Sequence, residues 1–152
     1  PAIAYANAFP AQAGFDRPLF VAFTASDPAH AYVVTQPGQV FAVARDGKSE
    51  ARHTFFDLGD KVLTDNWEEG LLGFAFDPGY AENGLVFACW SEETENTKGT
   101  MGNGKQAKSN RRSVVARYAT KVVEGRRVVD LGSELRVLEV FQPFGNHNGG
   151  TI

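Results

Sequence analysis

The stretch AYVVTQPGQVFAVA, residues 31–44, holds two strand patterns on either side of a turn signal. Residues 31–35 are rich in β-branched and aromatic side chains, and residues 39–44 alternate as side chains do along a pleated strand. Between them, Pro37 and Gly38 suit a type II turn, because proline presets one φ angle and glycine accepts a positive one. The stretch therefore predicts a strand, a tight turn and a second strand.

The same pattern continues on both sides of this stretch. Short apolar segments recur every 8–12 residues or so and are separated by glycine, proline or aspartate turns, including one at Ser26-Asp27-Pro28, which is typical of a sandwich, a barrel or a propeller. No segment has the pattern of a long amphipathic helix, so the predicted fold class is all-β. Residues 1–17 are expected to be an irregular lead-in, with Phe9, Phe15 and Leu19 as apolar anchors. The further predicted strands are 19–24, 53–58, 70–76, 85–90, 113–118 and 135–141, with a turn at 124–125.

Composition narrows the class of protein. The chain has 152 residues, of which 43% are hydrophobic, and its net charge is −3. This is typical of a globular protein and lacks the basic excess of a nucleic-acid binder. The one cysteine excludes an internal disulfide framework. No apolar run approaches the ~20 residues of a membrane span, and the alanine-rich N-terminus lacks the basic start of a signal peptide.

Residues 91–112 form a long polar insertion that is acidic at first and basic later. Within it, residues 99–105 match the first seven positions of a phosphate-binding P-loop. Gln106 at the eighth position has no hydroxyl for magnesium, and neither a buried strand before it nor a helix after it is predicted. We therefore expect a flexible loop here and no nucleotide site.

Other polar residues receive structural interpretations. An acidic group between residues 57 and 69 lacks the spacing of an EF-hand and is expected to be a solvated loop, although an acid at Glu68 or Glu69, beside the glycine-containing strand, could face a pocket. Cys89 is expected in the core. His30 and His53 have no evident partners and are expected to be structural or on the surface. The acidic group consists of Asp57, Asp60, Asp65, Glu68 and Glu69.

The segment PFGNHNGG, residues 143–150, places His147 between Asn146 and Asn148 in a run too rich in glycine for a helix. Proline and glycine allow a tight backbone path, which can direct a side chain into a cavity. An imidazole can accept a proton at neutral pH, so His147 is a candidate base, while a satisfied polar turn is the alternative.

Three segments taken in order resemble one family, the soluble quinoprotein sugar dehydrogenases, also described as glucose/sorbosone dehydrogenase-like. They are the run EGLLGFAFDP at residues 69–78, the turn Asn83-Gly84 with its following strand, and NHNGG at residues 146–150. Residues 113–118 stand where the family has a strand ending in Arg-Phe or Arg-Tyr. The resemblance covers roughly residues 18–152, with 91–112 as an insertion.

The resemblance implies a six-bladed β-propeller, of which residues 1–152 would be the N-terminal portion, about two blades and the start of a third. It also implies pyrroloquinoline quinone (PQQ) near the axis, with His147 as the general base that takes the proton of a sugar or polyol hydroxyl. Glu68 falls where the family has a polar side chain beside cofactor and substrate. Asn146 replaces a frequent aspartate. Because an amide cannot stabilise an imidazolium by charge, this departure bears on basicity and rate.

Further expectations follow from the same resemblance. The basic residues that hold the quinone and the calcium ligands would come from later blades, an external acceptor would take the electrons, and the protein would be periplasmic or secreted. An open pair of blades is expected to be poorly stable alone. The segment also resembles the propeller of Hedgehog-interacting proteins, so a catalytically silent binding or scaffold module is the alternative function.

Overall fold

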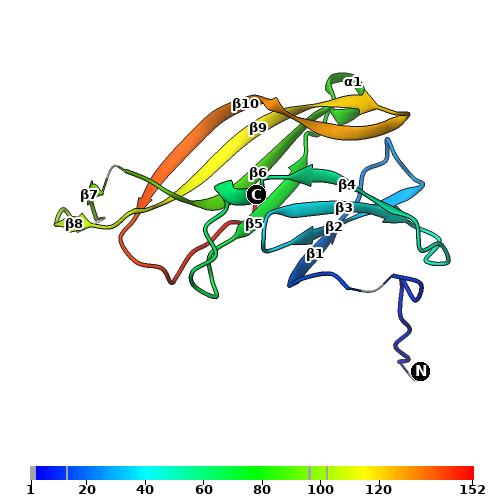
Figure 1. The fold of residues 1–152 in the computed structure, drawn as a ribbon, viewed down its shortest axis with the longest axis horizontal. Coiled ribbons are helices and arrows are strands. Elements are labelled where there is room, and N and C mark those ends of the chain that lie inside the picture. The colour runs from blue at the N-terminus through cyan, green and yellow to red at the C-terminus, as the bar shows by residue number, and fades with distance from the viewer. Residues whose placement is uncertain (1–2, 13, 96, 102) are drawn as a thin grey trace.

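The computed structural model describes residues 3–12, 14–95, 97–101 and 103–152. The fold is all-β, as predicted, and consists of two four-stranded antiparallel sheets and a small two-stranded hairpin (Figure 1). In the described part of the chain, helical structure is confined to the 3-10 turn η1 (Gly59–Lys61) and the single-turn α1 (Tyr80–Asn83). No helix in these ranges is long and apolar enough to cross a membrane.

The first sheet is an antiparallel meander in the order β1-β2-β3-β4. The expected turn joins β2 to β3: Gly38 has a φ of 113° and its N–H donates to the carbonyl oxygen of Thr35 at 3.2 Å. The third strand has the predicted bounds, and the others differ from the prediction by one or two residues at their ends. The strands are β1 (Pro18–Ala22), β2 (His30–Thr35), β3 (Gln39–Ala44) and β4 (Arg52–Asp57).

The lead-in covers the outer face of this sheet. Phe9 and Phe15 pack against a small buried cluster on β2 and β3, so two of the three expected anchors are confirmed. The third expectation was wrong, because 45% of Leu19 is exposed on the edge strand β1. The buried cluster consists of Ala31, Val33 and Val43.

The second sheet has the order β10-β9-β6-β5, so its strands also follow one another as a meander, apart from the hairpin inserted between β6 and β9. Its two last strands are longer than the sequence predicts. Residues 126–142 form one continuous strand, because register shifts after Asp130 and after Arg136 keep β10 paired with β9. The strands are β5 (Leu71–Phe76), β6 (Leu85–Glu93), β9 (Arg111–Val123) and β10 (Arg126–Gln142).

Residues 91–112 are more ordered than the long loop that the sequence predicts. Their first and last residues extend β6 and β9, and the middle forms the hairpin of β7 (Lys98–Thr100) and β8 (Gln106–Lys108). This hairpin projects away from both sheets (Figure 1). The segment that resembles a P-loop lies in it, so it neither follows a buried strand nor opens a helix; its residue Gly102 lies outside the described residues.

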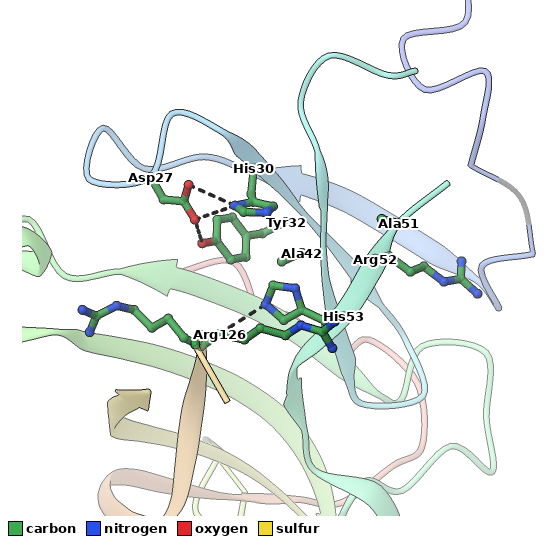
Figure 2. Close-up of a pocket in the computed structure, with 10 residues that line it drawn as sticks. Asp27, His30, Tyr32, Ala42, Ala51, Arg52, His53 and Arg126 are labelled. Carbon is green, nitrogen blue, oxygen red and sulfur yellow. Dashed lines mark hydrogen bonds and ion pairs between the residues drawn. The ribbon is translucent and has the colours of Figure 1, made fainter. Parts of the chain in front are cut away.

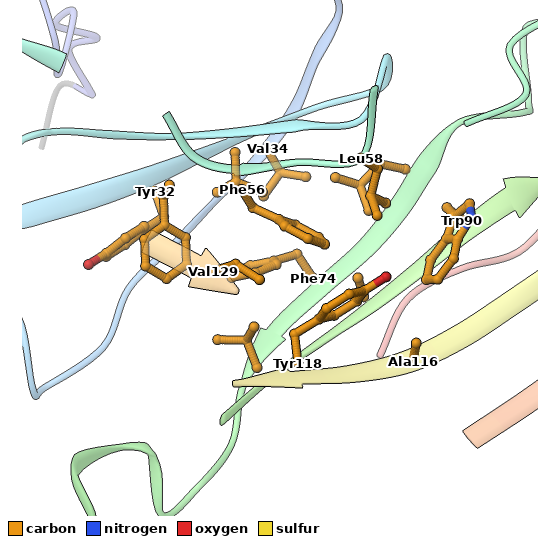
Figure 3. Packing of buried hydrophobic residues seen from close by; sticks show 14 of the residues in the cluster. Tyr32, Val34, Phe56, Leu58, Phe74, Trp90, Ala116, Tyr118 and Val129 are labelled. Carbon is orange, nitrogen blue, oxygen red and sulfur yellow. The ribbon is translucent and has the colours of Figure 1, made fainter. Parts of the chain in front are cut away.

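The main core lies between the two sheets (Figure 3). Aromatic rings from both sheets meet there edge to face, an arrangement that adds about 0.5–1.5 kcal/mol per pair beyond area burial. Phe56 of β4 lies 5.0 Å from the ring of Tyr118 on β9, and Tyr32 of β2 lies 4.8 Å from that of Phe76 on β5. Cys89 is buried beside this core, as predicted, and burial raises the pKa of its thiol.

Candidate functional site

The histidine turn, residues 143–150, follows β10 and lies against residues 66–73, which lead into β5. Its backbone is unusual at His147, whose φ of 62° lies in the left-handed region that residues with a side chain seldom adopt. Such a conformation persists where surrounding contacts hold it. The contacts that hold this turn come from Glu68.

The Glu68 carboxylate anchors the turn through the backbone. Its Oε2 atom accepts hydrogen bonds from the backbone N–H groups of His147 and Asn148, the second at 3.2 Å. Two donors on one charged oxygen make a stronger contact than neutral hydrogen bonds would. The structure thus brings together Glu68, which precedes the first strand of the second sheet, and Asn146–Asn148, which follow its last strand. Whether Glu68 also contacts a cofactor stays a prediction.

Two glycines let the turn approach this segment closely. A Cβ atom on Gly145 would collide with the side-chain amide of Asn66, and one on Gly150 would collide with Leu72. The reverse contact is equally tight, since a Cβ on Gly73 of β5 would meet the carbonyl oxygen of Gly150. Gly73 and Gly150, which lie in two of the resembling motifs, and the neighbouring Gly145 are therefore needed for this contact.

Beneath the turn, Glu69 is a buried charge and not the solvated residue that the sequence suggested. Only 1% of it is exposed, and its Oε1 atom accepts a hydrogen bond from Nε of Arg111 at 2.7 Å. Its Oε2 atom accepts from the backbone N–H and the side-chain amide of Asn66 at 3.0 and 2.9 Å. Because a buried charge needs such partners, Glu69 fixes the position of Asn66, and through it the support of Gly145.

The polar side chains of the turn differ in their surroundings. His147 and Asn146 are exposed. The amide oxygen and nitrogen of Asn148 are buried, yet neither has a hydrogen-bond partner among the residues that the structure describes. Buried amides normally have partners, so this one is available to a bound molecule. An apolar cavity of about 390 Å³ lies beside the turn and is lined by Phe20, Leu72, Gly73, Phe74, Thr151 and Ile152.

A second group of polar side chains around a cavity was missed by the sequence analysis. His30 and His53, expected to lack partners, line a cavity of about 380 Å³ together with Asp27, Tyr32 and the tip of the β9–β10 hairpin (Figure 2). Both oxygens of Asp27 lie within 3.0 Å of Nδ1 of His30, and one accepts the hydroxyl of Tyr32 at 2.7 Å. The only local signal is the spacing of Asp27 and His30 around a proline turn.

Charge and burial shift the acidity of this second group. Partial burial raises the pKa of Asp27, but hydrogen bonds from Tyr32 and His30 and the charge of His30 outweigh it and hold the pKa below its usual range. For His53, by contrast, burial lowers the pKa, and the charges of His30 and Arg126 lower it further. The nearby Asp27 carboxylate and the Arg127 carbonyl oppose these effects only in part.

The remaining acidic residues of the predicted cluster do not converge. Asp57 accepts hydrogen bonds from the backbone N–H of Gly59 and the side chain of Gln39, and Asp65 is 3.5 Å from Arg111. Across the residues that the structure describes, no three His, Cys, Asp or Glu side chains are grouped as ligands for a metal ion. A scan against protein-family models finds no family that matches this chain.

Proposed function

We propose that this chain is part of a β-propeller oxidoreductase similar to the PQQ-dependent sugar dehydrogenases, in which His147 acts as the base on a sugar or polyol hydroxyl. The two four-stranded meanders would be adjacent blades of a six-bladed ring. A propeller blade is a four-stranded antiparallel sheet, and successive blades pack around a central channel. The order of strands in both sheets and their packing on a shared core support this arrangement.

The observation that carries the proposal is the hydrogen bonding between Glu68 and the backbone of His147 and Asn148. It joins two of the three segments on which the resemblance rests, because Glu68 directly precedes the run 69–78 and His147 and Asn148 belong to the run 146–150. The left-handed conformation at His147 leaves its imidazole exposed while its backbone is held. A base held on a rigid backbone and open to an incoming substrate is what proton abstraction from a hydroxyl requires.

The residues around the turn fit the substrate side of such a site. A ring nitrogen of His147 would take the hydroxyl proton, and the unpartnered amide of Asn148 would donate to or accept from the bound molecule. A bound quinone would supply the acceptor for the hydride on the carbon that bears this hydroxyl. The Arg111 guanidinium reaches this segment but is already paired with Glu69 and Asp65. The cations that hold the carboxylates of PQQ would therefore lie in other blades, as would the calcium ligands.

The test is a reconstitution of the full-length protein with PQQ and calcium, followed by sugar-dependent reduction of a dye. The His147→Gln variant, which keeps a polar side chain but cannot accept the proton, is expected to lose about 10²-fold or more in kcat. Lys48→Gln, an exposed change on the β3–β4 loop, serves as the control. Turnover by His147→Gln equal to that of the control would exclude His147 as the base.

A catalytically silent binding module is the second candidate, because the β7–β8 hairpin projects from the sheets and carries exposed lysines (Figure 1). The same reconstitution separates the two candidates. A folded protein that retains no quinone absorbance and shows no activity with any sugar or polyol would favour the binding module. We propose a periplasmic or secreted location for either candidate, on the resemblance alone.

A further inference from the structure

The cavity that contains His30 and His53 lies far from the histidine turn. It is formed by β2, β3 and β4 on one side and by the tip of the β9–β10 hairpin, residues 125–127, on the other. Arg126 begins β10 and Gln142 ends it, and the histidine turn comes next. The cavity and the turn are therefore at opposite ends of a 17-residue strand, so one can be tested without the other.

Among the described residues that line this cavity, Asp27 is the only carboxylate, and both of its oxygens accept hydrogen bonds. It accepts hydrogen bonds from Nδ1 of His30, from the Tyr32 hydroxyl and from the backbone N–H of Ala29 at 3.2 Å. These contacts hold the His30 ring with Nδ1 toward the carboxylate, as Figure 2 shows, so Nε2 is the ring nitrogen left for a ligand. Asp27 orients the ring, and the hydrogen bonds from His30 and Tyr32 partly offset its negative charge.

The rest of the polar lining is cationic or can become so. The His53 ring stands edge-on to that of His30, with 5.7 Å between centroids, and Nε2 of His53 makes a long hydrogen bond of 3.4 Å to the Arg127 carbonyl oxygen. Arg126 and Arg127 enter from the hairpin tip. Within the described residues, neither guanidinium forms an ion pair with a carboxylate; Arg127 bonds the hydroxyl of Thr120 at 3.2 Å.

Arg52 contributes differently from these two arginines. Its guanidinium lies over the rings of Phe15 and Phe41, at 4.8 and 5.1 Å from their centroids, so it is directed toward the lead-in. Arg52 therefore adds positive charge near the cavity, and it forms part of the cavity wall. A metal ion is disfavoured here, because the neighbouring guanidinium groups would repel a cation.

We propose that this cavity binds a phosphate group, as inorganic phosphate or as the phosphate of a small monoester, with the guanidinium of Arg126 as its main donor and that of Arg127, which also bonds Thr120, as a second. Guanidinium groups match the oxygens of phosphate in geometry and charge, and the two imidazoles line the opposite wall. A cavity of about 380 Å³ accommodates a phosphate with a small organic group attached. The site belongs to the end of the fold opposite the proposed catalytic histidine.

The three histidines of the chain provide the test. In a histidine-ring NMR spectrum of the uniformly ¹⁵N-labelled protein, titration with sodium phosphate should shift the signals of His30 and His53 and leave that of His147 unchanged. Glycerol phosphate is titrated in parallel, and the ligand with the lower Kd identifies the source of the phosphate group. Sodium chloride at equal ionic strength controls for screening. Equal shifts of all three rings, or equal shifts with chloride, would overturn the proposal.

Matched arginine variants complete the experiment. The double change Arg126→Gln and Arg127→Gln is expected to weaken phosphate binding at least about tenfold, because both charged donors are lost. Arg45→Gln removes one charge from an arginine that lies over Phe23 and outside the cavity, and it should leave the Kd within about twofold. The circular dichroism spectrum of each variant is compared with that of the parent protein. The spectrum of the double variant should not change, because the substituted side chains at the hairpin tip are exposed. Equal affinities of the double variant and the control would refute the site.

Discussion

At the residue scale, the contact that matters most for the proposed site is between Glu68 and the backbone of the histidine turn. Two N–H groups depend on one carboxylate oxygen, and one of them belongs to a residue in the left-handed region. Without the carboxylate, the conformation at His147 loses the contacts that offset its intrinsic cost. Glu68 is therefore a positioning residue for His147, whatever else it contacts.

We accordingly predict that Glu68→Ala loosens the turn while the sheets stay intact. The exposed carboxylate contributes about 1 kcal/mol through its two hydrogen bonds, so the loss of global stability should be small. Amide hydrogen exchange at His147 and Asn148 should become markedly faster, and exchange in β3 should not change. Glu50→Ala, on the exposed β3–β4 loop, is the control. Unchanged exchange at His147 in Glu68→Ala would show that the turn is held by other contacts.

What sequence can reveal at this scale is set by the distance over which residues interact. The burial of Cys89 follows from its apolar neighbours, which are adjacent in the chain. Glu69 was misjudged because its partner Arg111 lies 42 positions away, and only the completed sheet brings them together. His30 and His53 were misjudged for the same reason, since they meet across strands and face a hairpin tip whose Arg127 lies 74 positions beyond His53.

At the scale of elements, most strands were predictable, because alternation and turn residues are local signals. The hairpin turn at Pro37-Gly38 and the bounds of β3 are examples. The length of β10 was not predictable. Residues 130–135 contain a glycine and a serine, which suggest a break, but pairing with β9 carries the strand through by shifts of register. A partner strand thus overrode the local pattern.

The β7–β8 hairpin is attached to the second sheet by a contact that can be tested. The ring of Phe141 on β10 lies directly over Gly99 of β7, so closely that a Cβ on Gly99 would collide with it. We predict that Phe141→Ala releases the hairpin, because the ring then no longer covers the glycine. Trypsin should cleave at Lys98 and Lys105 several-fold faster than in the parent protein. The melting temperature should change little.

The control for this prediction is Val137→Ala on the same strand. Val137 is 60% exposed, so its loss should affect neither the hairpin nor the core. Equal cleavage rates in Phe141→Ala and Val137→Ala would mean that the hairpin is held by the pairing of β7 with β8 and not by the Phe141 ring. A large fall in melting temperature in Phe141→Ala would instead make the hairpin part of the cooperative fold.

At the scale of the whole molecule, the two sheets bury a shared core but leave apolar surface elsewhere. The outer edges of β1 and β10 carry no further strand in the described part of the chain. On β10 in particular, large apolar side chains are 41–60% exposed. Open strand edges with apolar side chains favour pairing with another chain. The exposed set on β10 is Leu131, Leu135, Val137, Leu138 and Val140.

We therefore predict that residues 1–152, prepared alone, self-associate through β10. Light scattering after size-exclusion chromatography should give a mass above that of one chain, rising with concentration. The double change Leu135→Lys and Val137→Lys should shift the mass toward the monomer, because charge on an edge strand opposes pairing. Ala81→Lys on α1 combined with Glu50→Gln on the β3–β4 loop adds the same charge of +2 and should leave the association in place. A monomer at all concentrations, with a cooperative melt, would contradict the prediction. It would indicate that the two sheets form a self-contained fold, in which β10 needs no neighbouring blade.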